Sequence, residues 1–88
     1  MAIYFVSLNI NNEDQDYDDL IEAIESYDGY CHIFENQWFI CSDAEVDEIE
    51  EDLVQNLYEG DFILISEFAG NYAGWLPEEV VDWVERNR

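Results

Sequence analysis

Carboxylates crowd the stretch from Asp43 to Asp52, and their spacing is the most distinctive chemical pattern in this chain. Seven of these ten residues are acidic: Asp43, Glu45, Asp47, Glu48, Glu50, Glu51 and Asp52. A helix of about 15 residues starting here is about 22 Å long at ~1.5 Å per residue, so it carries about one charge per 3 Å. Phosphates along one strand of duplex DNA are ~3.4 Å apart. The pattern therefore predicts a surface that imitates a nucleic-acid backbone.

A second acidic row is expected on the preceding helix, whose outer face carries four carboxylates. Two such rows side by side resemble the two phosphate strands of a duplex, and a basic groove built for DNA or RNA is attracted to them. The alternatives are ordinary solvated helix faces or adaptation to high salt. The predicted partner-binding residues are Asp18, Asp19, Glu22, Glu25, Asp43, Glu45, Asp47, Glu48, Glu51 and Asp52.

Other residues that could do chemistry have weaker patterns. His32 is the only histidine, and on a strand its neighbour Cys31 points to the opposite face, which disfavours a Cys–His nucleophile. The oxygen-rich loop before Asp16 lacks the D-x-D-x-D-G order of an EF-hand. Cys31 and Cys41 lack C-x-x-C spacing and are interpreted as buried thiols. The residues favour a non-enzymatic protein, with no catalytic residue, metal or cofactor predicted.

Hydrophobic periodicity and helix-end residues place the elements that must position these side chains. The order βαββαβ followed by a helix predicts an α+β fold, a ferredoxin-like sandwich with an additional C-terminal helix, as a single domain over residues 1–88. An S-x-x-E capping box, Ser42 to Glu45, is expected to start the second helix. Strands are expected over 2–9, 30–35, 37–41 and 61–68, and helices from Asp16 to about Tyr27, from Ser42 to about Leu57 and from Pro77 onward.

Both faces of the predicted sheet are apolar. Alternation in the hairpin puts Cys31, Ile33, Phe39 and Cys41 on one face, and Tyr30, His32, Phe34, Trp38 and Ile40 on the other. Two helices cover one face, so the terminal helix, a second copy of the chain or a partner must cover the second. We expect a homodimer.

The charge of the chain limits its partners. Aspartate and glutamate number 23 of 88 residues, against two arginines and no lysine, which gives a formal net charge of −21. A nucleic-acid binder needs a basic patch, so direct nucleic-acid contact is not expected. With 49% hydrophobic residues the chain folds despite its acidity. No apolar run reaches the ~18 residues of a membrane helix and the beginning lacks signal-peptide features, so a cytoplasmic location without membrane contact is expected.

The stretches AIYFVSLNI, YDDLIEAIESY, YCHIFENQWFI and GWLPEEVVDWV resemble the SinR-like proteins, relatives of the small CRISPR-associated ferredoxin-fold nucleases. The resemblance runs over nearly the whole chain and is carried mostly by core-building residues. It implies a compact homodimer. In the nuclease members an aspartate at the end of the first strand helps to hold a divalent metal in the dimer, and the matching position here is Asn9. An amide is a weaker, uncharged ligand for a hard cation.

Two functions from different classes follow. The first is a non-enzymatic acidic binding protein, a nucleic-acid mimic that inhibits a basic DNA- or RNA-binding protein, for example a phage or mobile-element inhibitor of a host restriction or CRISPR nuclease. The alternative is a divalent-metal-dependent nuclease of the SinR-like, CRISPR-associated ferredoxin-fold type, with a metal near Asn9 at a dimer axis. A third interpretation is a structural or regulatory dimer from a salt-adapted organism.

Overall fold

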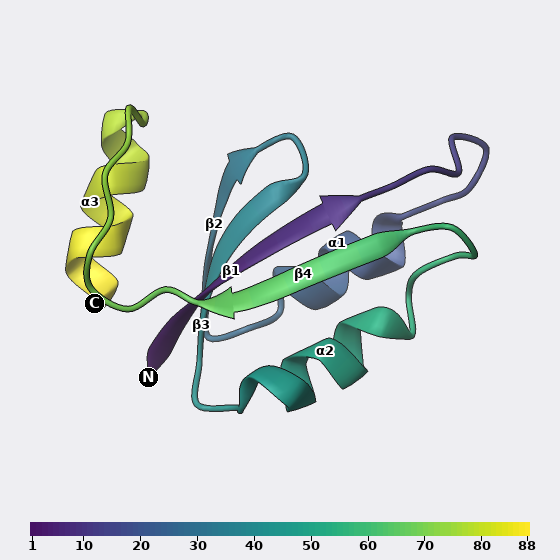
Figure 1. Cartoon of the computed structure of the whole chain (residues 1–88), viewed down its shortest axis with the longest axis horizontal. Helices are drawn as coiled ribbons and strands as arrows, with labels where there is room; N and C mark the ends of the chain where they lie inside the picture. The colour runs from purple at the N-terminus through teal and green to yellow at the C-terminus, as the bar shows by residue number, and fades with distance from the viewer.

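Four strands and three helices follow one another in the order expected from the sequence, in a computed structural model that describes all 88 residues. The four strands form one antiparallel sheet in the order β2-β3-β1-β4 (Figure 1). This is the strand order of a ferredoxin-like sandwich, so the predicted α+β fold with an additional C-terminal helix is confirmed. The elements are β1 (Ala2–Asn9), α1 (Asp18–Ile24), β2 (Gly29–Phe34), β3 (Gln37–Ser42), α2 (Val46–Val54), β4 (Phe62–Glu67) and α3 (Glu78–Asn87).

Helices α1 and α2 lie together on one face of the sheet (Figure 1). Each helix buries two residues at i, i+4 spacing, Leu20 and Ile24 in α1 and Ile49 and Leu53 in α2. Because residues four apart share one face of a helix, this spacing turns the remaining faces of both helices to solvent. The sheet meets them with Tyr4, Val6, Leu8, Trp38 and Ile40.

Helix α3 packs on the opposite face of the sheet. Val80 and Val84 lie against Ile3, Phe39 and Cys41, which alternate along β1 and β3 with the residues of the first core. The terminal helix is therefore the element that covers the second face. The cover is partial, because Phe62 and Leu64 of β4, which pair with Asn9 and Ser7 on this face, are 66% and 62% exposed.

A β-bulge in the hairpin changes the face of one aromatic residue. His32 pairs with Trp38, but the next pair is Phe34 with Gln37, so β2 has an extra residue, Ile33. An extra residue breaks the alternation of side chains. Phe34 consequently shares the face of α3 and not the face of His32, and the prediction for Phe34 is wrong. Both cysteines are free thiols, and Cys41 is buried as predicted, but Cys31 is only half-buried, so the prediction of two buried thiols is wrong for Cys31.

The second helix is shorter than predicted because both of its ends differ. Ser42 does not cap it, since its Oγ accepts the N–H of Ala44 at 3.0 Å in a local turn. Glu45 occupies the N-cap position, and its backbone N–H donates to Glu48 Oε1 at 3.1 Å. After Val54 the chain leaves the helix in two tight turns, with hydrogen bonds from the N–H groups of residues 56 and 57 to the carbonyls of residues 53 and 54. Helix α2 therefore has nine residues.

Candidate functional site

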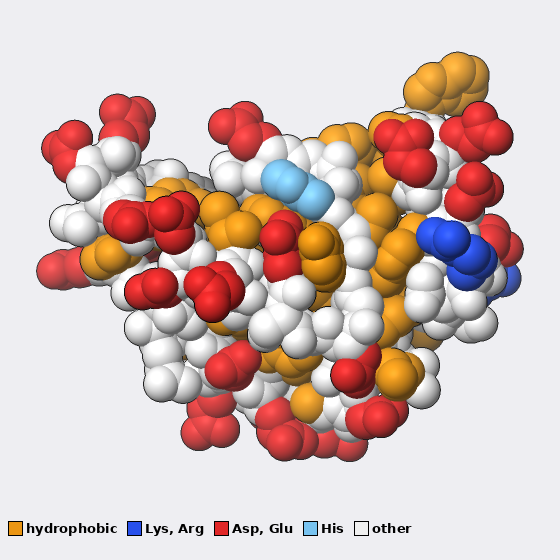
Figure 2. All heavy atoms as spheres, turned by 180° about the vertical axis from the view of Figure 1, so that it is seen from behind, with side chains coloured by type: hydrophobic (Ala, Val, Ile, Leu, Met, Phe, Trp, Pro, Cys, Tyr) orange, Lys and Arg blue, Asp and Glu red, His pale blue; other side chains and the backbone are white.

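The outward carboxylates of α1 and α2, together with those that lead into α2, form one surface, which we call the acidic surface. In Figure 2 acidic side chains are spread over most of the visible face, the α3 end included, and the two arginines lie together near the end of α3. All predicted partner-binding residues lie on this surface, and all are exposed except the half-buried Glu25. The acidic surface comprises Asp18, Asp19, Glu22, Glu25, Asp43, Glu45, Asp47, Glu48, Glu50, Glu51 and Asp52.

The acidic rows are shorter than the sequence suggested. Nine residues give α2 a length of about 14 Å, and the seven residues of α1 about 10 Å, at ~1.5 Å per residue. At ~3.4 Å per phosphate, the α2 row is as long as about four phosphates of one DNA strand. The predicted length of about 22 Å is therefore wrong, because the residues before Val46 and after Val54 lie outside the helix.

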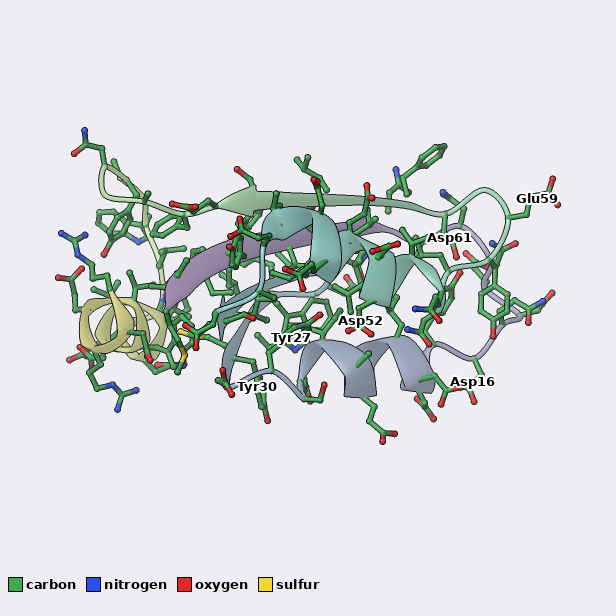
Figure 3. All side chains as sticks on the ribbon, turned by 90° about the horizontal axis from the view of Figure 1, so that it is seen from below. Asp16, Tyr27, Tyr30, Asp52, Glu59 and Asp61 are labelled. Carbon is green, nitrogen blue, oxygen red and sulfur yellow. The ribbon has the colours of Figure 1, made fainter.

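Two carboxylates of the acidic surface accept hydrogen bonds from buried or half-buried aromatic side chains. Tyr27, which follows α1, donates its hydroxyl hydrogen to Asp52 Oδ2 on α2 at 2.7 Å, and the two side chains point toward one another in Figure 3. Burial, and then this hydrogen bond, raise the pKa of Tyr27. Trp38 Nε1 donates to Glu25 Oε2 at 3.2 Å. Asp52 and Glu25 thus connect the acidic surface to the core.

Positive charge is almost absent from the acidic surface. The structure has two ion pairs, and one of them joins the N-terminal ammonium group of Met1 to Asp43 at 3.6 Å. The other, Arg88 with Glu85 at 3.6 Å, lies on α3. No lysine or arginine lies on α1 or α2. The carboxylates of these two helices therefore create a negative field that no side chain of the protein neutralises.

Asp61 accepts four hydrogen bonds that connect two loops, a role that was not predicted from the sequence. Its Oδ1 accepts the backbone N–H of Asn11 at 2.8 Å and the side-chain amide of Asn12 at 3.0 Å. Its Oδ2 accepts the Tyr17 hydroxyl at 2.6 Å and the backbone N–H of Tyr58 at 2.9 Å. Burial raises the pKa of Asp61, but these hydrogen bonds lower it by more, and the net pKa lies below its ordinary value. Asp61 thereby fixes the loop before α1 against the turn before β4.

His32 and the asparagines of the loop before α1, which were considered for catalysis or metal binding, contact other residues of the fold. The His32 ring stacks on Trp38, with centroids 4.1 Å apart and planes 3° apart. In the loop before α1, the amide groups of Asn11 and Asn12 donate to the carbonyls of Gly60 and Glu59 at 2.7 and 2.8 Å. No three His, Cys, Asp or Glu side chains come close enough together to hold a metal ion. Asn9 lies exposed at the end of β1, so a metal there would need ligands from a second copy.

Comparisons with known proteins return no matching family model, curated protein or solved structure. The resemblance to SinR-like proteins therefore stays a prediction from the quoted stretches. None of the three helices has the length and apolar composition needed to cross a bilayer. The geometry and charge of the acidic surface are thus the basis for a function.

Proposed function

We propose that this chain is a non-enzymatic acidic binding protein whose acidic surface occupies the nucleic-acid site of a basic DNA- or RNA-binding protein. One observation carries the proposal: two helices lie side by side on one face of the sheet, their carboxylates face solvent, and neither helix has a basic residue. A site built from lysines and arginines for phosphates meets the same sign of charge at similar spacing here.

Inhibition by this surface is competitive and electrostatic. Many carboxylates each contribute modestly, and the field of the whole molecule accelerates encounter with a basic partner. The short rows match only a few phosphates on each side, so the expected target is a compact basic groove. We place this activity in the cytoplasm, with a phage or mobile-element inhibitor of a host restriction or CRISPR nuclease as the setting.

The two acidic rows are also held in a fixed relation to one another. The hydrogen bond from Tyr27 to Asp52 connects α2 with the residues that follow α1. The hydrogen bond from Trp38 to Glu25 connects the end of α1 with β3. A preorganised charge pattern loses less conformational freedom on binding than a flexible acidic tail does. This rigidity supports a mimic over a general polyanion.

The test is a pair of charge reversals on the acidic surface. Glu22→Lys with Glu51→Lys changes two exposed carboxylates whose side chains make no hydrogen bond or ion pair, whereas Glu48 and Asp52 are avoided because they bond to Glu45 and Tyr27. We expect this variant to bind a basic partner, isolated from lysate by salt-sensitive retention on the wild-type protein, at least tenfold more weakly.

The matched control is Glu35→Lys with Asp82→Lys. It makes the same change in net charge at exposed residues outside α1 and α2. We expect near wild-type affinity. Equal weakening by both pairs would show that the partner senses only net charge, and the proposed mimicry would then be wrong.

The nuclease alternative has its own measurement. It requires cleavage of RNA or DNA that depends on Mg²⁺ or Mn²⁺ and that is lost in Asn9→Ala. Such cleavage by the purified wild-type protein would contradict the non-enzymatic proposal.

A further inference from the structure

A cavity of about 340 Å³ lies between the sheet face that α3 covers and the segment that leads from β4 to α3. The sheet contributes Phe5, Phe34 and Phe39 to its wall, and the segment contributes Phe68 and Tyr72. The ring centroids of Phe39 and Phe68 are 4.6 Å apart, and those of Phe68 and Tyr72 are 5.0 Å apart. A concave wall of packed aromatic rings fits a flat apolar side chain.

The cavity has no carboxylate directed into it. Glu67 contributes to its edge, but Glu67 pairs with Tyr4, and directly paired residues share one face of a sheet. Tyr4 belongs to the core under α1 and α2, so the Glu67 side chain points to that opposite face. The cavity therefore takes an uncharged group.

Trp75 is next to the cavity in the chain, but its side chain does not pack against the rest of the protein. It is 99% exposed, although its neighbours in the chain, Gly74 and Leu76, both line the cavity. Large aromatic side chains are rarely left fully in water, and tryptophan is enriched among the residues that dominate protein interfaces. Trp75 thus has the properties of an anchor for another molecule.

A surface that carries both an anchor side chain and a cavity, adjacent on one segment, can bind the same surface of a second copy. A two-fold axis beside such a segment brings the anchor of each copy opposite the cavity of the other, because a two-fold interface uses the same patch twice. Two distant patches would instead build open chains of molecules. The position of Trp75 between two cavity residues therefore favours a closed pair.

The charge distribution indicates the same surface. The stretch from Phe68 to Pro77 contains no charged residue, and the exposed Glu78 and Glu79 follow it directly at the start of α3. Beside it, Arg88 Nη1 donates to the carbonyl of Gly70 at 3.3 Å, its guanidinium group lies 5.9 Å from the centre of the Tyr72 ring, and it pairs with Glu85. Two copies that each carry a net charge of −21 repel one another least where carboxylates are absent or paired.

We propose that two copies of this chain associate about a two-fold axis beside the segment from Phe68 to Pro77, each inserting Trp75 into the aromatic cavity of the other. The half-exposed Phe34, which lines the cavity, becomes buried by the incoming indole. This contact leaves α1 and α2, on the other face of the sheet, free for a basic partner.

The test uses one variant without the anchor and one without the cavity. Trp75→Ala removes a side chain that contacts nothing in the monomer, and Ser66→Phe fills the cavity from β4. Sedimentation equilibrium should show wild-type dimers, and each variant should associate at least tenfold more weakly. Tyr30→Ala is the matched control, because Tyr30 is an exposed aromatic residue on the opposite sheet face, and it should dimerise as wild type does.

Mixing the two variants gives the sharpest readout. A mixed pair keeps one complete contact, Trp75 of the Ser66→Phe copy in the open cavity of the Trp75→Ala copy, so the mixture should associate more tightly than either variant alone. A wild-type protein that stays monomeric, a Trp75→Ala variant that dimerises normally, or a mixture no tighter than its components would each overturn the proposal.

Salt separates this association from the proposed function. Screening reduces repulsion between two acidic copies, so self-association should strengthen as salt rises, whereas binding of a basic partner should weaken. Circular dichroism confirms that each variant is folded. Self-association and partner binding can therefore be measured separately, and the failure of one proposal does not prevent the test of the other.

Discussion

Single carboxylates in this acidic chain have very different tasks. Most face solvent and contribute only to the field of the molecule, but Asp61 receives four hydrogen bonds, three from Asn11, Asn12 and Tyr17, which are distant in the sequence, and one from nearby Tyr58. Asp52 belongs to both groups, since it lies on the acidic surface and accepts the Tyr27 hydroxyl. At the scale of residues, an acidic side chain must therefore be classified by what it contacts and not by its charge.

Replacement of Asp61 by asparagine should destabilise the protein at neutral pH. The folded-state pKa of Asp61 lies below the ordinary value of 3.8, so its charged form stabilises the fold. That contribution is complete above about pH 3.8 and is lost as the pH falls through the lower folded-state pKa. We expect a melting temperature several degrees below wild type at pH 7, and a difference that shrinks below about pH 3.8.

Glu59→Gln is the control for this prediction, because Glu59 lies exposed in the same turn and its side chain makes no hydrogen bond (Figure 3). Its melting temperature should follow wild type. A difference between Asp61→Asn and wild type that stays constant through acid pH would contradict the assigned role of Asp61.

Tyr27→Phe should cost about 1 kcal/mol of unfolding free energy, the usual net value of one hydrogen bond. The change removes the hydroxyl that binds Asp52 and keeps the ring. Tyr30→Phe removes a hydroxyl without an intramolecular partner and should cost nothing measurable. Urea denaturation of the two variants decides the matter, and equal stabilities would show that the Tyr27–Asp52 bond is not stabilising.

At the scale of elements, hydrophobic alternation and helix spacing were sufficient to predict the fold. The predicted order of strands and helices agrees with the structure, and the buried pairs of α1 and α2 have the i, i+4 spacing of one helix face. The start of α2 was not predictable, because Ser42, a residue preferred at N-caps, ends β3 instead, and the helix starts after Glu45, which is not among the preferred N-cap residues. The bulge at Ile33 is likewise a property of strand pairing and leaves no local signal.

The candidate site was predictable only in part, because local sequence patterns indicate which carboxylates are exposed but not which side chains of other segments contact them. Exposure of the carboxylates follows from helix periodicity, so the acidic surface was found. The aromatic residues that donate to Glu25 and Asp52, and three of the four donors to Asp61, come from other segments that only the fold brings together.

Helix α3 protects one cysteine, and this gives a test of its docking. Burial raises the pKa of the Cys41 thiol, and Val84 of α3 packs in the same cluster. Val84→Asp places a carboxylate in this apolar contact, which costs several kcal/mol. In a Cys31→Ser background, we expect a thiol reagent to modify Cys41 at least tenfold faster than in the parent protein.

The control is Arg86→Glu, which adds a carboxylate at an exposed position of α3 and should leave the rate unchanged. If Cys41 stays protected in a folded Val84→Asp variant, α3 is not the element that covers it.

At the scale of the whole molecule, the net charge of −21 acts against the compact state. The midpoint of urea denaturation should therefore rise between about 10 mM and about 1 M salt, as the Debye length falls from ~30 to ~3 Å. The Glu35→Lys, Asp82→Lys variant has four fewer negative units, a net charge of −17 against −21, and should show a smaller rise.

The same titration addresses salt adaptation. Because apolar cores form on both faces of the sheet, we expect the protein to be folded at the lowest salt. Unfolding there and refolding in molar salt would favour the salt-adapted interpretation over mimicry.

Displacement of a nucleic acid from a partner is the most direct test of the acidic surface. A basic protein retained by the wild-type chain and eluted by short DNA or RNA is purified, bound to a fluorescent oligonucleotide, and titrated with this protein while anisotropy is recorded. We expect wild type and Glu35→Lys, Asp82→Lys to displace the oligonucleotide at similar concentrations, and Glu22→Lys, Glu51→Lys to need at least tenfold more. Formation of a ternary complex without displacement, or equal displacement by all three proteins, would contradict nucleic-acid mimicry by α1 and α2.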